Sequence, residues 1–312
     1  MQVFNSIKDL TKNKNTILTL GTFDGIHQGH LKIIDKLVSC SKEKGCRNVV
    51  ITFYPHPRKV LGKDNSVKML STQEEKIKLL EKYGVENLLI IEFTKEFAAL
   101  TAEKFIYDYL VDGIGLKEIV LGHDHHFGKG REGNAEVLYR IGKNENFIVT
   151  QTDAVVIDGE IVSSTKIRNA LIDGQIIKAN KLLGRNYEFS GVVVGGDKRG
   201  RKLGYPTANI KLSSAEKLLP AVGIYAVKIF LDGKLHNGLL SIGKRPTFYN
   251  DGEIVTEVYI YDFDNEIYGE KVTVELIERL RGEEKFNSAD ELINQMNKDK
   301  ENGLKIFNKL NN

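Results

Sequence analysis

Two histidines three residues apart give the chain its clearest chemical signal, in the segment GTFDGIHQGH at residues 21–30. An apolar run precedes this segment and an amphipathic stretch follows it, which predicts a strand that leads into a helix. At a helix start, His27 and His30 can turn toward one site, where unpaired backbone N–H groups favour a phosphate. By themselves, the two side chains also fit half of a zinc site or a solvated surface.

A second segment with phosphate-binding character is GDKRGRKLGYPTANI, at residues 196–210. Its glycines expose backbone N–H groups, and its lysines and arginines add positive charge. On a strand, Thr207 and Asn209 face the same side, where their oxygens suit Mg²⁺ that carries a nucleotide phosphate. The composition alone also fits a basic surface hairpin with a turn fixed by proline.

The first segment lies in a part of the chain where apolar runs alternate with amphipathic stretches. This alternation predicts βαβ units, a parallel sheet, and ligands beyond the carboxyl ends of its strands. Because the runs are continuously apolar, each strand is expected to be buried on both faces. Thr72 and Glu75 form a capping-box pattern, which predicts a helix start. The strands are expected at residues 16–20, 48–53, 87–93, 118–122 and 147–152, and further helices at residues 31–38, 102–111 and 165–172.

In the second half of the chain, shorter strands follow one another across Gly-rich turns, and Asp232-Gly233 is a hairpin signal. Closely spaced strands of this kind predict an antiparallel sandwich or a small barrel. The apolar spacing in residues 288–310 predicts a final helix. We therefore expect an α/β domain at residues 1–183 and a β domain with a C-terminal helix at residues 184–312.

Composition excludes several classes of protein. At roughly 150 residues per domain, 312 residues correspond to two domains, and 41% hydrophobic with 28% charged residues excludes wholesale disorder. The net charge of 45 − 42 = +3 is too small for a protein devoted to nucleic acid or to a membrane surface. No apolar run reaches the ~18–20 residues of a membrane span, and the sequence shows neither a signal peptide nor a disulfide framework. We expect a cytoplasmic monomer or weak homo-oligomer that binds neither nucleic acid nor membrane.

Three later segments join the histidine segment in a recognisable order. They are YPHPR at residues 54–58, LGHDHHFGKGR at residues 121–131 and IVSSTKIR at residues 161–168. Together with residues 21–30, they resemble the HxGH nucleotidyltransferase superfamily, in the form typical of bacterial FAD synthetases. The resemblance implies a Rossmann-like domain that transfers an adenylyl group from ATP to FMN and releases FAD and pyrophosphate.

The resemblance also assigns roles to residues of this first domain. His27 and His30 would donate hydrogen bonds to the phosphoryl oxygens, and Arg168 would stabilise the leaving pyrophosphate. One residue departs from the pattern, because His125 stands where many members have an aromatic side chain. Further ATP contacts are implied for Gly21, Phe23, Asp24, Gly29, Asp124, Arg131, Ser163, Ser164 and Thr165, and flavin contacts for Pro57 and Arg58.

Residues 196–210 closely resemble the riboflavin kinase signature GxRGRxLGxPTAN, and later segments resemble its other motifs in order. The resemblance implies a six-stranded antiparallel barrel that converts riboflavin and ATP into FMN and ADP. Glu257 would be the general base, Thr207 and Asn209 would bind Mg²⁺, and Tyr259 replaces a histidine common in the family. Further ATP or flavin contacts are implied for Gly196, Arg199, Gly200, Lys202, Gly204, Arg281 and Glu283.

Other interpretations stay open from the sequence. One alternative is a first domain that transfers its adenylyl group to another phosphorylated metabolite, and a second is a flavin- or RNA-binding regulator without catalysis. GKGREG at residues 128–133 spells GxGxxG, but no helix opens directly on it at the spacing of a dinucleotide site. His123, His125 and His126 lack the partner ligands that zinc sites usually have. The intact motifs in both halves favour the bifunctional enzyme.

Overall fold

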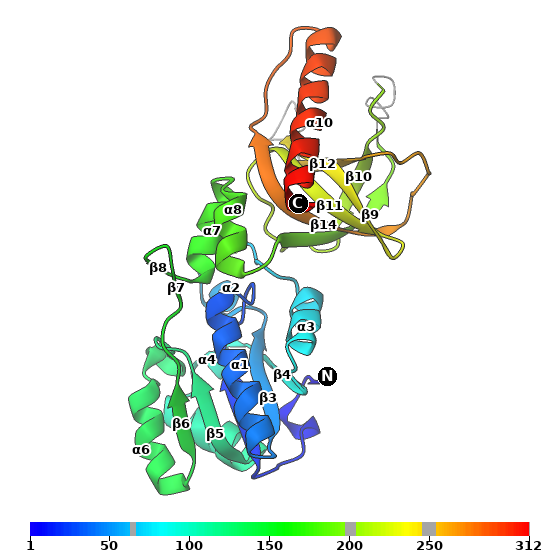
Figure 1. Ribbon diagram of the computed structural model, residues 1–312. Helices are drawn as coiled ribbons and strands as arrows, with labels where there is room; N and C mark the ends of the chain where they lie inside the picture. The colour runs from blue at the N-terminus through cyan, green and yellow to red at the C-terminus, as the bar shows by residue number, and fades with distance from the viewer. Residues whose placement is uncertain (63–66, 197–203, 245–253, 312) are drawn as a thin grey trace. The chain divides into compact units, whose positions relative to one another are not determined.

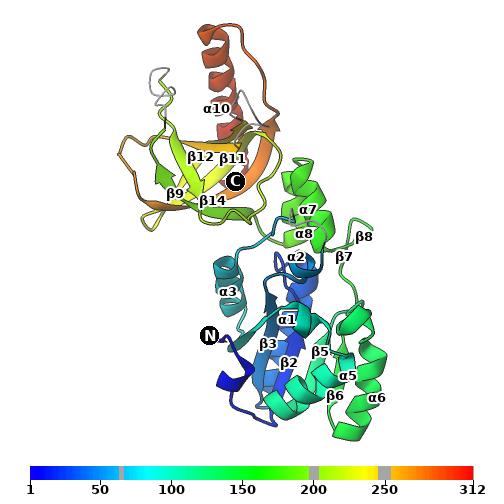
Figure 2. The same ribbon diagram turned by 180° about the vertical axis from the view of Figure 1, so that it is seen from behind.

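A computed structural model describes residues 1–62, 67–196, 204–244 and 254–311 (Figures 1 and 2). The chain divides into two compact units, Met1–Ser164 and Thr165–Asn312. Among the residues that the structure describes, no helix combines the length and the apolar character needed to cross a membrane.

The first unit contains a six-stranded sheet in the order β1-β4-β3-β2-β5-β6. Every neighbouring pair in it runs parallel, as the alternating pattern predicts. The strands are β1 (Gln2–Phe4), β2 (Thr16–Leu20), β3 (Arg47–Tyr54), β4 (Asn87–Glu92), β5 (Leu116–Leu121) and β6 (Ile148–Gln151).

Helices cover both faces of this sheet (Figure 1). Side chains such as Ile17 and Val50 pack with α1 (Gln28–Glu43) and α3 (Gln73–Lys82) on one face. Their neighbours on the same strands pack on the other face with the remaining helices, so alternate residues enter two separate cores. Those helices include α5 (Ala102–Phe105), the π-helix η2 (Ile106–Ile114) and α6 (Ala135–Glu145). The unit also contains η1 (Ile7–Asp9), α2 (Pro57–Leu61), α4 (Lys95–Ala98) and η3 (Lys129–Arg131).

Some local expectations hold and others are wrong. Thr72 and Glu75 form the expected capping box at the start of α3. The expectation of full burial fails for β6, because it is an edge strand in which Ile148 is 52% exposed. The three-residue strand β1 is too short to show a pattern, and the helix expected at 102–111 continues from α5 as a π-helix.

A hairpin and two helices connect the sheet to the barrel. The hairpin is β7 (Val156–Ile157) with β8 (Glu160–Ile161), and the helices are α7 (Ser164–Ile172) and α8 (Ile176–Leu183). Asn180 of α8 donates to the carbonyl of Leu276 in the barrel at 2.9 Å and accepts the N–H of Tyr187 at 2.7 Å. The compact units therefore divide before these helices, and a functional boundary at residues 183/184 stays a prediction.

The second unit is a closed barrel in the order β10-β13-β12-β11-β14-β9. All its pairs are antiparallel, which confirms the six-stranded barrel implied by the resemblance. Asp232 and Gly233 form the predicted hairpin turn, with positive φ values of 46° and 73°. The elements are β9 (Tyr187–Val194), β10 (Ala208–Leu212), β11 (Gly223–Leu231), β12 (Lys234–Lys244), β13 (Ile254–Ile260), β14 (Lys271–Arg281) and the final helix α10 (Ala289–Asn311).

Close packing of β9 against β10 leads to a stability prediction. A Cβ atom on Gly191 would lie 2.4 Å from the Ile210 side chain and 2.6 Å from the Lys211 carbonyl oxygen. Gly191→Ala is therefore expected to lower the free energy of unfolding of the barrel by about 1–3 kcal/mol, as overpacking does. Urea unfolding measures this change. Gly195→Ala is the control, since a Cβ there has open space, and an equal loss in both variants would contradict the packing argument.

Candidate active sites

The two histidines of the first motif lie at the junction between β2 and α1. His27 caps α1, and its Nδ1 accepts the backbone N–H of His30 at 3.3 Å. The two rings stack with centroids 3.7 Å apart and planes within 14° of parallel. Because Nδ1 of His27 is an acceptor, the neutral ring carries its proton on Nε2, which can donate to a phosphate oxygen. The structure therefore brings both predicted side chains together at a helix N-terminus.

Small residues of the motif leave room for these rings. A Cβ atom on Gly29 would lie 3.2 Å from the His27 ring, and one on Gly21 would lie 3.2 Å from the Phe23 ring. Phe23 in turn packs edge-on against His30, with 5.1 Å between ring centroids. Glycine at both positions thus lets aromatic rings approach the backbone closely. These neighbours fix where the two histidines lie.

The turn that precedes α1 has a backbone conformation that needs support from its surroundings. Phe23 and Ile26 have φ values of 47° and 36°, in the left-handed region that side chains normally avoid. The buried carboxylate of Asp24 accepts the N–H groups of Leu70 and Ser71 at 2.9 and 3.2 Å. Asp24 therefore holds the turn against the segment before α3, and a direct contact between Asp24 and ATP stays a prediction.

The SSTxIR segment reaches the same turn. Ser164, the first residue of α7, donates its hydroxyl to the carbonyl of Asp24 at 2.9 Å. Ser163 and Thr165 flank it in the sequence. Arg168 lies four residues further along α7, on the same helix face as Ser164. The structure thus connects Ser164 to the histidine turn, whereas a contact between Arg168 and pyrophosphate is still an expectation.

Three of the predicted motifs meet at one edge of the sheet. Strands β3, β2 and β5 are adjacent and parallel. Residues 21–30 follow the end of β2, while residues 54–58 and 121–131 begin at the last residues of β3 and β5. Parallel strands end at a common edge, and ligands of α/β sheets bind there. This convergence places the histidines where a nucleotide site is expected.

Pro57 and Arg58 begin the short helix α2, just beyond the end of β3. Pro57 is its first residue, and Nδ1 of His56 accepts the backbone N–H of Arg58 at 3.1 Å. Both residues therefore belong to the sheet edge at which the motifs meet, as the flavin assignment requires. Their contact with flavin is a prediction that mutation must test.

The loop after β5 presents Asp124 and Arg131 to solvent. The Asp124 side chain is 81% exposed, and its backbone carbonyl lies 2.9 Å from Nδ1 of His126. The His125 ring stacks on Phe127, and burial of the imidazole lowers the pKa of His125 to about 4, so it is neutral at pH 7. His125 thus packs like the aromatic residue common at this position. Within the described ranges, no three His, Cys, Asp or Glu side chains gather as a metal site.

Three residues predicted for the kinase reaction come together where β10 pairs with β13, and Thr207 directly precedes β10. Asn209 of β10 lies opposite Glu257 of β13, and the Thr207 hydroxyl donates to the Glu257 carboxylate at 3.0 Å. Gly196 lies against the Asn209 amide, where a Cβ atom would come within 2.1 Å of Nδ2. Hydroxyl, amide and carboxylate oxygens form a donor set that suits Mg²⁺. The predicted contacts Arg199, Gly200 and Lys202 lie outside the described residues.

Arg281 and Glu283 have partners within the barrel unit. The Arg281 guanidinium donates to both carboxylate oxygens of the buried Asp299 on α10, at 2.8–3.1 Å. Gln295 donates to the same carboxylate at 2.9 Å. Glu283 lies close to Gly243 of β12, where a Cβ atom would be 3.1 Å from its Oε1. Arg281 therefore ties β14 to α10, and a role of either residue toward flavin stays a prediction.

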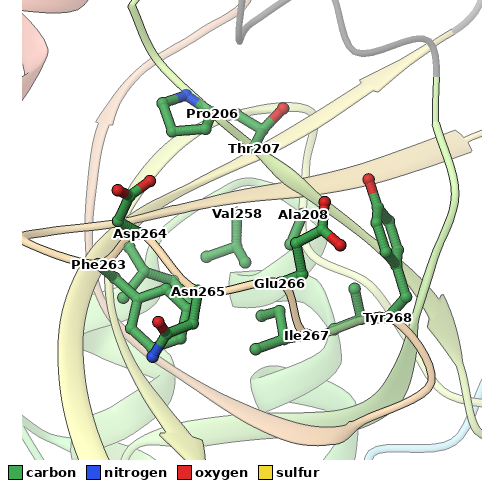
Figure 3. Close-up of a pocket in the computed structure, with 12 residues that line it drawn as sticks. Pro206, Thr207, Ala208, Val258, Phe263, Asp264, Asn265, Glu266, Ile267 and Tyr268 are labelled. Carbon is green, nitrogen blue, oxygen red and sulfur yellow. The ribbon is translucent and has the colours of Figure 1, made fainter.

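A cavity of about 90 Å³ lies beside Thr207, and Thr207 is the one residue of its lining with a role predicted from the sequence (Figure 3). Its walls are apolar where Val258 and Ile267 lie, and the carboxylates of Asp264 and Glu266 flank them in this view. Apolar walls with a few polar groups are typical of small-molecule sites. In the sequence, the only sign of this cavity is that residues 263–268 are aromatic and acidic and lie next to a Tyr-Gly turn.

Gly204, a predicted contact of the kinase site, lies two residues before Pro206, which lines the cavity.

Tyr259, which replaces a histidine of the riboflavin kinase pattern, lies in a group of aromatic side chains in the barrel unit. Its ring packs edge-on against Tyr205 and Tyr261, with centroids 5.1 and 5.7 Å apart. The Lys300 ammonium of α10 lies 5.8 Å from the Tyr259 ring centroid, within the range of a cation–π contact. Tyr259 thus packs between the barrel and α10, which suits a tyrosine at this position.

Comparison with known proteins matches both units of the chain. Family models for FAD synthetase and riboflavin kinase match residues 9–166 and 183–307. The bifunctional riboflavin kinase/FMN adenylyltransferases of Listeria monocytogenes and Bacillus subtilis are 39% and 38% identical, over 95% of this chain and 94% and 93% of theirs. A crystal structure of a protein described as a macrolide-efflux protein from Streptococcus pneumoniae is 35% identical, with a TM-score of 0.88 over 96% of this chain and 97% of that one. With both halves matched in order, this chain belongs to the family of bifunctional riboflavin kinase/FMN adenylyltransferases.

Proposed function

We propose that this chain makes FAD from riboflavin in two steps that both consume ATP. The barrel unit transfers the γ-phosphoryl group of ATP to riboflavin and yields FMN and ADP. The parallel-sheet unit then transfers the adenylyl group of a second ATP to FMN and yields FAD and pyrophosphate. The observation that carries the proposal is the pair of intact sites, the stacked histidines at the sheet edge and the Thr207–Glu257 pair on the barrel.

In the adenylyl transfer, an oxygen of the FMN phosphate attacks the α-phosphorus of ATP, and the bond to pyrophosphate breaks. Negative charge grows on the phosphoryl oxygens, and Nε2–H of His27, the imidazole of His30 and the N-terminus of α1 stabilise it. Arg168 takes the role of stabilising the leaving pyrophosphate. The attacking group is already a phosphate, so the reaction needs no covalent enzyme intermediate.

In the kinase reaction, Glu257 accepts the proton of the terminal ribityl hydroxyl as that hydroxyl attacks the γ-phosphorus. The Thr207 hydroxyl donates to Glu257 and orients its carboxylate. Thr207 and Asn209 would hold Mg²⁺, which neutralises phosphate charge when it is bound with ATP. The cavity beside Thr207, with a volume of about 90 Å³, suits the bicyclic purine of ATP better than the larger flavin ring.

The cellular setting follows from the same proposal. Both reactions use Mg²⁺ and soluble small molecules, and neither involves nucleic acid. The two cysteines are free, which suits the reducing cytoplasm. We place the protein there, as a monomer or a weak homo-oligomer.

The test is a time course with the pure protein, riboflavin, ATP and Mg²⁺, with the flavins separated by chromatography. FMN that rises and then converts to FAD supports both reactions. FMN that accumulates without FAD, even when FMN is supplied, contradicts the adenylyl transfer and favours a different acceptor. Unchanged riboflavin and unchanged FMN, with flavin bound to the protein, support a binding protein instead of an enzyme.

The hydroxyl of Thr207 gives a further prediction. Thr207→Val keeps the shape of the side chain but removes its bond to Glu257 and its ligand oxygen. A hydrogen bond to a charged group is worth about 1.5–3 kcal/mol, so riboflavin phosphorylation is expected to slow by about 10–100-fold. Initial rates over a range of Mg²⁺ concentrations measure the loss. Thr273→Val, which removes a hydroxyl bonded to Ser190 instead, is the matched control, and similar rates in the two variants would contradict the assignment.

A further inference from the structure

Besides Asp24 and Ser164, the buried residue Lys76 contacts the strained turn before α1, and the mechanism above does not use it. Lys76 of α3 is buried, with 6% of its surface exposed. Its ammonium donates to the carbonyl of Thr22 at 2.7 Å and lies 3.3 Å from the hydroxyl oxygen of Thr52. The Thr52 hydroxyl lies at the end of β3 and donates to the same Thr22 carbonyl at 3.2 Å. One carbonyl of the motif GTFDG therefore receives two hydrogen bonds from two other elements.

The position of Lys76 has an energetic cost. A buried cation loses its hydration, and burial lowers the pKa of Lys76 to about 8, although the carboxylate of Asp24 opposes this shift. On the far side of the turn, Ser71 accepts the N–H of Gly25 at 3.1 Å. Hydrophobic or neutral side chains normally fill such buried positions at less cost. A cation held here suggests a purpose beyond packing.

The turn itself needs this support. Left-handed φ values at Phe23 and at the β-branched Ile26 are unfavourable, and such conformations persist only where their surroundings fix them. The next residue after Ile26 is His27, whose ring stacks on His30. A change in the turn therefore moves the groups that face the phosphoryl oxygens.

We propose that Lys76 is a positioning residue for adenylyl transfer: by binding the Thr22 carbonyl, its ammonium sets the turn that aims His27 and His30. The inference rests on the proposed function, because it needs an adenylyl transfer at this site. Lys76 acts through the backbone and does not touch the reacting atoms. It affects catalysis because a shift of about 1 Å in a catalytic group can cost on the order of 100-fold in rate.

Three variants in the full-length protein test the role of Lys76. Lys76→Met keeps the length of the side chain and removes its donor, and is expected to lower kcat for FAD formation from FMN about 10–100-fold. The KM values for ATP and FMN are expected to change less than about three-fold, because binding contacts stay in place. Lys76→Gln keeps an N–H donor and is expected to recover part of kcat. Lys78→Met is the matched control, since Lys78 lies on the same helix in an exposed pair with Glu74.

Two further measurements keep a folding defect apart from the proposed role. Riboflavin phosphorylation by the same preparation reports whether the protein is folded and active elsewhere. If Lys76→Met does not fold, Thr52→Val decides the matter, because it removes the second donor to the Thr22 carbonyl and one acceptor of Lys76, while the ammonium keeps its bond to Thr22. That variant is expected to lower kcat for FAD formation about 3–10-fold with KM unchanged.

The outcomes separate the inference from the function on which it rests. Wild-type kcat in Lys76→Gln and Thr52→Val, a loss confined to KM, or an equal loss in Lys78→Met would each overturn the inference alone. If the wild-type protein forms FMN but no FAD from FMN and ATP, both the adenylyl transfer and the role of Lys76 are wrong. A kcat for FAD formation that is highest in the wild type, lower in Lys76→Gln and lowest in Lys76→Met supports the role of Lys76.

Discussion

Replacing His30 by alanine is expected to lower the rate of FAD formation from FMN and ATP by about 10²–10³-fold, the loss typical of removing one preorganised donor to a developing oxyanion. His30 lies in the first turn of α1, with its ring stacked on His27 at 3.7 Å. The substitution removes the imidazole but keeps the backbone N–H that His27 accepts. Initial rates of FAD formation with saturating FMN measure the loss.

His30 is a cleaner target than His27. His27 also caps α1, so His27→Ala would add a loss of stability of about 1 kcal/mol to the loss of catalysis. Riboflavin phosphorylation by the same His30→Ala protein is the internal control, and it is expected to stay within about two-fold of wild type. His30→Gln keeps an N–H donor, so its rate of FAD formation should lie between those of the wild type and His30→Ala. FAD formation at the wild-type rate in His30→Ala would show that the stacked histidines do not carry the reaction.

The sequence predicts the parts of the fold that depend on local patterns. Continuous apolar runs mark β2 to β5, because strands buried on both faces leave no polar alternation. The capping box at Thr72 and the Asp232-Gly233 turn are chemically specific within a few residues, and both lie where predicted. Burial of β6 is predicted wrongly because position in the sheet, and not the composition of the run, decides which strand is at the edge.

In the candidate sites too, residues within local motifs can be predicted from the sequence, and residues held by long-range contacts cannot. Residue type and spacing single out His27, His30 and Thr207 as candidates, whereas Glu257 comes only from the resemblance to riboflavin kinases, and the roles of all four stay predictions. Lys76 escapes such reasoning, since it lies 54 residues from its partner Thr22 and resembles any lysine on an amphipathic helix.

The buried role of Asp24 is also invisible in the sequence. Its carboxylate bonds backbone N–H groups 46 and 47 residues away, and those contacts exist only once β2 and α3 are packed together. The motif predicts that Asp24 contacts ATP, whereas the structure shows its carboxylate bonded to the backbone that holds the turn. Long-range hydrogen bonds of this kind leave no local pattern, so only the structure reveals them.

The second large effect is expected at Glu257 in the barrel. Glu257→Gln should slow riboflavin phosphorylation by about 10²–10⁴-fold, the contribution typical of a positioned general base. The amide keeps nearly the same shape and can still accept the Thr207 hydroxyl through its oxygen, so the pairing of β10 with β13 should survive. It cannot accept the proton of the ribityl hydroxyl. Chromatographic initial rates with riboflavin, ATP and Mg²⁺ measure the effect.

Two controls show whether this loss is specific to the base. Conversion of supplied FMN to FAD should be unchanged in Glu257→Gln, because that reaction uses the other unit. Glu275→Gln is matched in chemistry and lies on the same barrel, where Glu275 accepts the amide of Asn186 at 3.3 Å, and it should phosphorylate riboflavin at the wild-type rate. If Glu257→Gln kept that rate too, Mg²⁺ and positioning would suffice for phosphoryl transfer, and Glu257 would serve only to orient Thr207.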